Sequence, residues 1–364
     1  MDLSKSIDFL LEKSGDVIKY RLHKEILHDL SKTEEENLLE KVMLTQNYKL
    51  LESYQKANGY IGIGMHSGDK YKETPLQGGE EAARLISNYA IPKDTPLVVN
   101  FAKALQDENI LEDEFSYANS EIKRFQNRFI GTESGSSLKL LIDTCLALMG
   151  FGDDNIIEDT KKISYDTFMK ITKIESIDEI TKFNPKSKKK YNYPYIEPNT
   201  YYPCVYHLQI LSYTNSWKNE QSKKALADAL NHLNNITKGY SIHVKIGNNY
   251  YCPLWPLIDP IRPYETNRID TMYRRKLTDI VKMGIGKNVD VVNISVMNLL
   301  SDLEKDGILR IDFENAYHKR FYKQGQRYPS AYSEVSLEPD YKSDLCLWCD
   351  LTFWAVQFLY LYGG

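Results

Sequence analysis

The feature that most constrains the fold is a weak internal repeat of helix pairs. Amphipathic segments that read as a helix, a short turn and a second helix begin near six positions: Asp16, Gly79, Ser137, Tyr202, Thr271 and Leu345. Successive starts lie 58 to 74 residues apart, a spacing too loose for a short solenoid motif. A helix pair cannot bury its apolar face alone, so a regular series of pairs must stack on itself. Six curving pairs can close into a ring, and we therefore expect an all-α fold, an α/α toroid of about six pairs.

The spacing of apolar residues assigns most of the chain to helices. Before the second repeat, helices are expected at Leu3–Glu12, Asp16–Leu30, Thr33–Leu44 and Tyr48–Ala57. The pairs that follow are expected at Gly79–Tyr89 with Thr95–Gln106, Ser137–Met149 with Asn155–Ile174, Tyr202–Tyr213 with Glu220–Ile236, and Thr271–Gly284 with Val289–Glu304. Further helices are predicted at Ser116–Phe129 and Phe313–Lys323. The last helix, Leu345–Leu361, has no partner after it, so the N-terminal helix is expected to complete its pair and close the ring.

One strand signal stands out among the helices. Tyr240–Ile246 and Tyr250–Leu254 flank the turn sequence Gly247-Asn248-Asn249, which favours a β-hairpin. We therefore interpret residues 1–364 as a single toroid domain with a hairpin-containing insertion at 237–270.

The lengths of the connections favour one end of the ring as the working face. Connections within a pair are short, whereas those between pairs span 58–78, 107–136, 183–201, 237–270 and 325–344. In a ring of alternating helices all the long connections fall at one end, and long ordered loops are usually functional. Fourteen of the 27 tyrosines lie in these stretches. This placement favours a ligand-facing or loop-packing role, and the alternative is compositional drift in an AT-rich genome.

Composition narrows the class of protein. A net charge of −4 argues against a dedicated nucleic-acid binder, and no run approaches 18 uncharged apolar residues, so no membrane span is expected. The first residues carry acids and lack a small-residue cleavage site. Five scattered cysteines fit free thiols in a reducing compartment. These features predict a cytoplasmic protein with a small-molecule ligand.

Several stretches resemble one family of bacterial proteins. A glycine turn at Asn58–Gly62 is followed by Asp69–Thr74, and the inner-helix sequences of Leu141–Asp153, Tyr202–Tyr213 and Asp350–Tyr360 combine small and apolar residues with a final glycine or aromatic group. These segments resemble the prenyltransferase and squalene-cyclase-type repeats of the terpenoid cyclase and protein prenyltransferase superfamily. The resemblance implies an α/α toroid and a terpenoid-cyclase-like pocket.

The chain departs from that family at its catalytic motifs. The D-x-D-D acid motif of terpenoid cyclases is missing from the sequence, as is the Q-x₃-G-x-W repeat, of which Gln55, Gly59 and Ile61 are at most a remnant. No Asp, Cys and His set matches the zinc site of protein prenyltransferases. We therefore expect no metal and no cofactor, and the family's chemistry is not carried over.

Catalytic candidates are chosen by residue type and by position near the long connections. The candidates are His207, His66, Glu133 and Asp350. Imidazole titrates near neutral pH and can act as acid or base, but His207 is equally a candidate for a satisfied core histidine. The candidates for ligand binding are Tyr60, Tyr71, Arg128, Tyr202, Tyr206, Trp255 and Trp348. For each of these ligand-binding candidates, the structural alternative is loop packing or a salt bridge at the rim of the pocket.

Two further motifs suggest chemistry but are better explained by structure. Asp153 and Asp154 precede Glu158 and Asp159, with the wrong spacing for a diphosphate–magnesium motif, so helix capping is the preferred interpretation. Cys346-x-x-Cys349 has no second ligand pair after it, which favours buried structural thiols.

Three functions remain open at this point. The first is a terpenoid-cyclase-like toroid whose aromatic pocket acts on a small, partly apolar or ring-shaped ligand. The second is a carbohydrate-active lyase or hydrolase-like toroid that uses Tyr and His as acid and base. The third is a non-catalytic binding protein on the same scaffold, and the missing acid motif favours it over a true terpenoid cyclase.

Overall fold

Helices make up most of the described structure, a computed structural model of the 364-residue chain. The structure describes residues 1–62, 64–65, 76, 78–115, 137–183, 195–197, 202–237, 243–246, 249–251, 271–310, 337–338 and 343–364. This content confirms the expected all-α class. The predicted helices at 116–129 and 313–323 lie outside the described residues.

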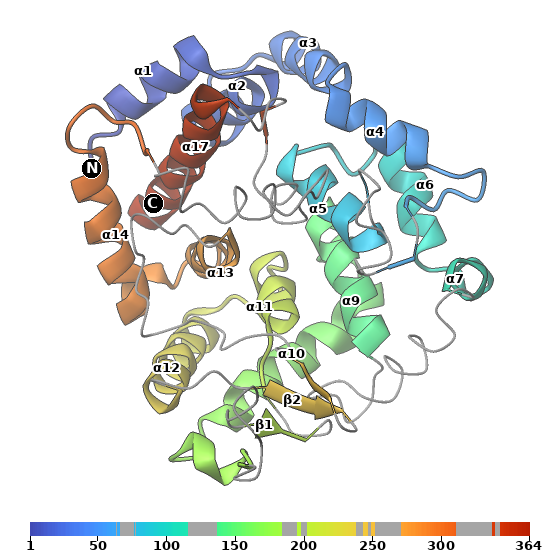
Figure 1. Cartoon of the computed structure of the whole chain (residues 1–364), viewed down its shortest axis with the longest axis vertical. Helices are drawn as coiled ribbons and strands as arrows, with labels where there is room; N and C mark the ends of the chain where they lie inside the picture. Colours follow the sequence, from blue (N-terminus) through green and yellow to red (C-terminus); the bar gives the residue numbers. More distant parts are fainter. Residues whose placement is uncertain are drawn as a thin grey trace.

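Six helices lie around the centre of the molecule (Figure 1). They are α2 (Asp16–Leu22), α5 (Gly79–Asn88), α9 (Ser137–Leu146), α11 (Val205–Ser212), α13 (Thr271–Lys282) and α17 (Asp344–Gly363). Helix α5 packs on α9, α9 on α11, α11 on α13, α13 on α17, and α17 on α2. The guanidinium of Arg21 on α2 donates to the carbonyl of Asn88 on α5 at 2.8 Å. We refer to these six as the central helices, and each begins within three residues of a predicted repeat start.

A second set of helices packs against the central ones. It includes α1 (Ser4–Lys13), α3 (Lys32–Met43), α4 (Gln46–Tyr54), α6 (Pro96–Ala104), α7 (Glu108–Phe115), α10 (Glu158–Ile171), α12 (Glu220–Ile236) and α14 (Asp290–Leu303). Helix α10 packs against α11 and α12, and α1 packs against both α2 and α17. The N-terminal helix therefore accompanies the last helix, as the sequence predicts. Helix α7 was not anticipated.

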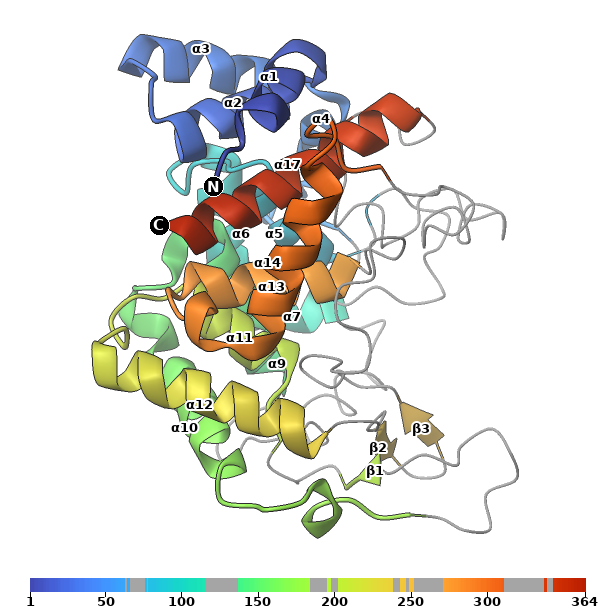
Figure 2. The ribbon, with the colours of Figure 1, turned by 90° about the vertical axis from the view of Figure 1, so that its left-hand side faces the viewer.

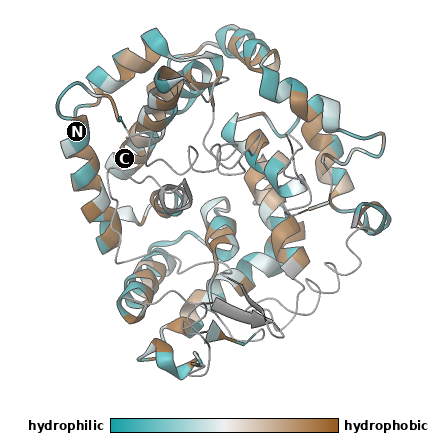
Figure 3. Ribbon diagram, viewed as in Figure 1, coloured by the Kyte–Doolittle hydropathy of each residue, from teal (hydrophilic) through white to brown (hydrophobic). Residues whose placement is uncertain are grey.

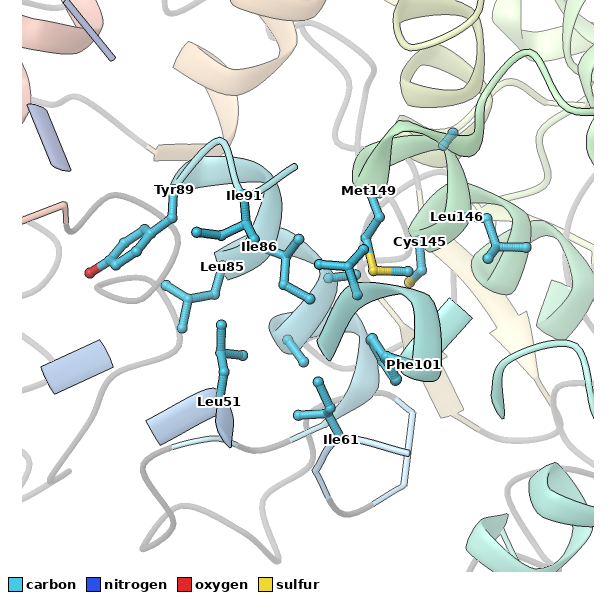
Figure 4. Packing of buried hydrophobic residues seen from close by; sticks show 14 of the residues in the cluster. Leu51, Ile61, Leu85, Ile86, Tyr89, Ile91, Phe101, Cys145, Leu146 and Met149 are labelled. Atoms are coloured by element: carbon cyan, nitrogen blue, oxygen red, sulfur yellow. The ribbon is translucent and has the colours of Figure 1, made fainter. Parts of the chain in front are cut away.

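The apolar core runs through two clusters of buried side chains that share α11 and α17. On α17, Phe353 belongs to the first cluster and Leu351 to the second. A close view of the first cluster shows Ile86 of α5 between Leu51 and Leu85 on one side and Cys145 and Met149 on the other (Figure 4). Each fully buried side chain of this size contributes about 1.5–3 kcal/mol. The central helices are therefore apolar on more than one face.

Helix α17 is long and apolar enough to cross a membrane by length and composition alone. Its most apolar window of 18 residues has a mean hydropathy of 1.3, but 67% of that window is buried inside the fold. The brown, apolar stretch of α17 in Figure 3 lies among the other central helices. This burial fits the core helix of a soluble protein, because a helix that is apolar all round is buried in a core or in a membrane.

Two central helices change to π geometry where they end. Helix α2 continues as the π segment η1 (His23–Leu27), and α9 continues as η4 (Ala147–Phe151). The prediction of one α-helix over Asp16–Leu30 is therefore wrong after Leu22. π segments are rare and are often found at functional sites.

A small sheet lies beside the helical body, near the end of α12 (Figure 2). Strand β2 (His243–Ile246) pairs antiparallel with β3 (Asn249–Tyr251), with Lys245 opposite Tyr250. These strands occupy the position of the predicted hairpin, although both are shorter than expected. Strand β1 (Tyr195–Ile196), which pairs parallel with β2, was not predicted.

Candidate functional site

A buried group of polar side chains joins α5 to α11. Glu80 and Arg84 lie one turn apart on α5, and Tyr206 and Gln209 lie on α11. All four are buried, with exposed fractions between 0% for Gln209 and 8% for Glu80 and Tyr206. Charges in an apolar interior are strongly unfavourable unless they are paired. We refer to these four side chains as the Glu80 cluster.

One carboxylate oxygen, Oε1 of Glu80, organises the cluster. Arg84 donates to it from Nη2 at 2.6 Å and from Nε at 3.1 Å. The phenol of Tyr206 donates to the same oxygen at 3.1 Å, and Nη2 of Arg84 lies 3.4 Å from Oε1 of Gln209. Glu80 stands in the first turn of α5, where the helix dipole favours a negative charge.

The protonation states follow from burial. Burial raises the pKa of Tyr206 well above its ordinary value, and the negative charge of Glu80 adds to the rise. Burial and Glu80 likewise raise the pKa of the neighbouring Cys145 thiol. Both groups therefore keep their protons near neutral pH, so Tyr206 can donate a hydrogen bond or a proton but is not a resident base.

Gln209 provides the clearest sign of a missing partner. Its amide nitrogen Nε2 is buried and has no hydrogen-bond partner within the described part of the chain. A buried donor without an acceptor costs roughly 1–3 kcal/mol, and native structures rarely leave one without a reason. The amide is therefore the group of the cluster best suited to receive an acceptor from a ligand.

Tyr60, a predicted ligand-binding residue, packs against the start of α5. Its phenol donates to the carbonyl of Gly64 at 2.7 Å, and its ring meets Phe101 edge-on at 5.6 Å between centroids. A Cβ atom at Gly79 would lie 2.6 Å from the phenol oxygen. Tyr60 therefore fixes the turn before α5 and requires glycine at position 79.

His207, a predicted catalytic residue, is a fully buried part of the start of α11. Its Nδ1 accepts a hydrogen bond from the backbone N–H of Cys204 at 3.1 Å. Burial lowers the pKa of His207 to about 4, so the ring is neutral at physiological pH. Nε2 is buried and makes no hydrogen bond to any residue that the structure describes. This geometry fits a histidine that caps the start of α11 with Nδ1, while Nε2 makes no hydrogen bond within the described residues.

Asp350, also predicted as catalytic, holds a chain segment in place. Its Oδ1 accepts the backbone N–H groups of Leu337 at 2.7 Å and Glu338 at 3.1 Å. The Glu338 carboxylate in turn accepts the N–H of Gly15, just before α2, at 2.6 Å. Asp350 thus links α17 to the start of α2 through residues 337 and 338.

The other described candidates occupy different environments. Tyr202 is buried, burial raises its pKa, and its phenol has no partner among the residues described. Trp348 is half-buried, and the guanidinium of Arg310 lies 5.1 Å from its ring centre. The remaining candidates, His66, Tyr71, Arg128, Glu133 and Trp255, lie outside the described residues.

The two motifs that the sequence assigns to structure rather than to chemistry have structural partners. Asp153 accepts the backbone N–H of Asn215 at 2.7 Å and its side-chain amide at 2.8 Å, so it joins two turns. Among the residues described, no group of three or more His, Cys, Asp or Glu side chains is arranged to hold a metal.

A second ion pair, between the buried Arg21 and the half-buried Glu25, links the end of α2 to α17 through Gln357. Arg21 binds Glu25 through two bonds, Nε to Oε1 at 2.7 Å and Nη2 to Oε2 at 2.9 Å. Gln357 of α17 donates to Oε2 of Glu25 at 2.7 Å, and the Arg21 guanidinium lies 4.8 Å from the Phe353 ring centre. Burial acts to raise the pKa of Glu25, but Arg21, Lys282 and Gln357 outweigh it and lower the value.

Sequence reasoning missed Glu80, Arg84 and Gln209. The available signal was an ion pair at i and i+4 within the first helix of a repeat pair, a helix that must be buried on several faces if the ring closes. The same signal marks Arg21 and Glu25. Charges at such positions are expected to be buried and paired.

Comparison of the chain with models of protein families, with curated proteins and with solved structures finds no match.

Proposed function

We propose that this chain is an α/α toroid that binds a small, hydroxylated ring-shaped ligand at the Glu80 cluster. Support for the toroid comes from the successive packing of α5, α9, α11, α13, α17 and α2, and from the Arg21–Asn88 hydrogen bond between α2 and α5. The site is at the end of the ring where the long connections enter, because Glu80 and Tyr206 stand in the first turns of α5 and α11. The protein is cytoplasmic in this proposal.

The observation that carries the ligand proposal is the amide of Gln209. It lies beside a charged pair and a phenol, with Nε2 buried and without a partner among the described residues. Hydroxyl groups of a sugar-like ring can both accept from this amide and donate to the Glu80 carboxylate. A purely apolar ligand offers no acceptor, so the cluster favours a carbohydrate over an isoprenoid.

For a carbohydrate-active enzyme, Tyr206 is the candidate proton donor. Its pKa is raised by burial and by Glu80, so the phenol is protonated at neutral pH and can pass a proton to a leaving oxygen. His207 is neutral and buried, and its ring nitrogen Nδ1 bonds to the backbone of Cys204. Tyr206 therefore replaces His207 as the leading catalytic candidate.

Two alternatives rest on separate features. A terpenoid-cyclase-like activity draws on the resemblance of the helix repeats and on the aromatic residues near the first turns, such as Tyr60 and Tyr202. A non-catalytic binding protein on the same scaffold needs only the buried cluster and its ligand. All three share the toroid and differ in what binds.

Thermal unfolding with three ligand classes separates the proposals, because binding to the native state raises the melting temperature. We expect neutral mono- and oligosaccharides to raise it and prenyl diphosphates to leave it unchanged. Gln209→Met should keep or increase the melting temperature of the free protein and remove the saccharide shift. Gln106→Met, at a side chain that bonds only its own helix, should retain the shift. A shift with prenyl diphosphates alone, or with no class, contradicts the carbohydrate proposal.

A further inference from the structure

Two lysines bond to adjacent residues, Ser212 and Tyr213, at the opposite end of the central helices, where α11 and α13 finish. The ammonium of Lys282, the last residue of α13, donates to the phenol of Tyr213 at 2.7 Å. The ammonium of Lys218 donates to the carbonyl of Ser212 at 3.2 Å and to Oδ1 of Asn215 at 3.0 Å. Both lysines are half-buried, so their ends are enclosed yet reachable from solvent.

Within the described residues, both ammonium groups donate to neutral oxygens. Within the described ranges neither Lys218 nor Lys282 forms an ion pair with a carboxylate. Lys223, close by on α12, differs because it pairs with Glu220 at 2.5 Å. Two half-buried cations without a paired anion repel each other. Binding of an anion beside them relieves this repulsion and is therefore favourable.

The carboxylates around this pair are engaged by other donors. Glu25 is held by Arg21 and Gln357, and Asp153 is held by Asn215. Asp279 accepts a bond from Ser212 at 3.4 Å, and its negative charge helps to raise the pKa of Lys282.

The net effect of burial and neighbouring charges on the pKa differs between the two lysines. For Lys282, burial and Arg21 lower the pKa, but Tyr213 and Asp279 raise it further, so the net shift is upward. For Lys218, burial, Lys282 and Lys223 lower the pKa, and Asp153 offsets only part of this effect. Lys218 therefore carries the less compensated charge.

We propose that Lys218 and Lys282, with the phenol of Tyr213, form a binding site for a phosphate-type oxyanion. The two ammonium groups supply charge and up to six N–H donors, and the Tyr213 phenol, which accepts a bond from Lys282, has its own O–H to donate. Lys282 and Lys218 would turn from their present neutral acceptors toward the oxyanion. This site is separate from the Glu80 cluster and does not depend on the function proposed for it.

A competing account is that the lysines only compensate the negative ends of α11 and α13. Cations near a helix C-terminus are favoured by about 0.3–1 kcal/mol. That account predicts that substitution lowers stability and that phosphate acts no differently from chloride. The oxyanion site predicts a specific response to phosphate, so the two accounts differ in a measurable way.

The test compares inorganic phosphate with chloride at matched ionic strength, by titration calorimetry and by thermal unfolding of the full chain. We expect phosphate to bind the wild-type protein and to raise its melting temperature by a few degrees. Lys218→Met should reduce phosphate affinity at least tenfold and leave the unfolding midpoint in chloride unchanged or higher, because it relieves repulsion. Lys287→Met is the matched control, since this exposed lysine at the same end contacts Tyr362 and Gly363, and it should bind phosphate as the wild type does.

Either of two results overturns the proposal: no phosphate-specific response in the wild type, or an equal loss of affinity in Lys218→Met and Lys287→Met. If Lys218→Met does not fold, the broadening of the phosphate ³¹P resonance is measured instead, with the wild-type protein and with Lys218→Gln. Broadening by wild type that persists unchanged in Lys218→Gln contradicts the site.

Discussion

The phenol of Tyr206 donates a hydrogen bond to the carboxylate of Glu80 over 3.1 Å, across 126 residues of sequence. The bond joins the second and fourth helices of the repeat, α5 and α11, which both pack on α9. It also brings the ion pair of Glu80 and Arg84 against a protonated phenol in a buried setting. This contact makes the Glu80 cluster a single unit rather than a set of separate side chains.

Removing the Tyr206 hydroxyl should weaken the protein measurably. Tyr206→Phe leaves Glu80 with one donor fewer in a buried site, where a bond to a charged group contributes about 1.5–3 kcal/mol. We expect a loss of this size in the free energy of urea unfolding. Tyr54→Phe, at a partly buried tyrosine of α4, should change it by less than about 0.5 kcal/mol. Equal effects of the two substitutions would mean that the Tyr206–Glu80 bond adds nothing.

Breaking the Arg21–Glu25 ion pair, where α2 meets α17, should lower the free energy of unfolding more than removing the Tyr206 hydroxyl. Arg21→Met leaves the Glu25 carboxylate, whose side chain is 26% exposed, with the Gln357 amide as a donor. Removing one partner of a fully buried pair costs about 3–5 kcal/mol, and we expect the lower end of that range because Glu25 is half-buried. Chemical unfolding measures the loss. Lys49→Met breaks an exposed pair with Glu52 and should cost at most about 1 kcal/mol. A small effect of Arg21→Met would show that this ion pair does not stabilise the contact between α2 and α17.

His207 should make the fold sensitive to acid. Its pKa is about 4 in the folded chain and about 6.5 when unfolded. The unfolded state therefore takes up a proton first, so the contribution of His207 to stability is fully present above pH 6.5. It is lost progressively as the pH falls from 6.5 to 4, by on the order of 3 kcal/mol.

Stability curves against pH for two histidine variants test this assignment. His207→Gln should flatten the curve between pH 6.5 and 4, whatever its effect at neutral pH. His28→Asn serves as the control because His28 is exposed and its left-handed backbone, with φ of 53°, suits asparagine. It should leave the slope unchanged. A His207→Gln curve parallel to that of the wild type contradicts the assignment.

A close backbone contact between two central helices should make Gly152 irreplaceable. A Cβ atom at this position would lie 1.9 Å from the carbonyl oxygen of Tyr213, at the end of α11. Gly152→Ala must push the turn after η4 away from α11, and we expect a loss of several kcal/mol or failure to fold. Gly363→Ala meets no atom within 4 Å and should be neutral in the same unfolding assay.

The sequence predicted the central helices well because their apolar periodicity is long and regular. Helix α12 was predicted at its observed bounds, Glu220–Ile236, and α17 within two residues at each end. The π segments η1 and η4 could not be predicted, because apolar spacing does not distinguish one wide turn at a helix end from a regular one. Strand β1 has two residues and exists through its pairing with β2, which local sequence does not encode.

The candidate site was predicted only in part, for a similar reason. Tyr206 was identified from its position near the start of a central helix, and it does lie in the buried cluster. Glu80 and Arg84 were overlooked because a charged pair at i and i+4 normally marks a solvated helix face. Their burial depends on neighbours from α11, more than a hundred residues away.

The location of the bound ligand tests the central claim most directly. A crystal structure should be determined with the saccharide that raises the melting temperature most. The account predicts ligand density within hydrogen-bond distance of the Gln209 amide and the Glu80 cluster. Density bound only outside the central helices, with Nε2 of Gln209 satisfied by another part of the chain, would contradict it.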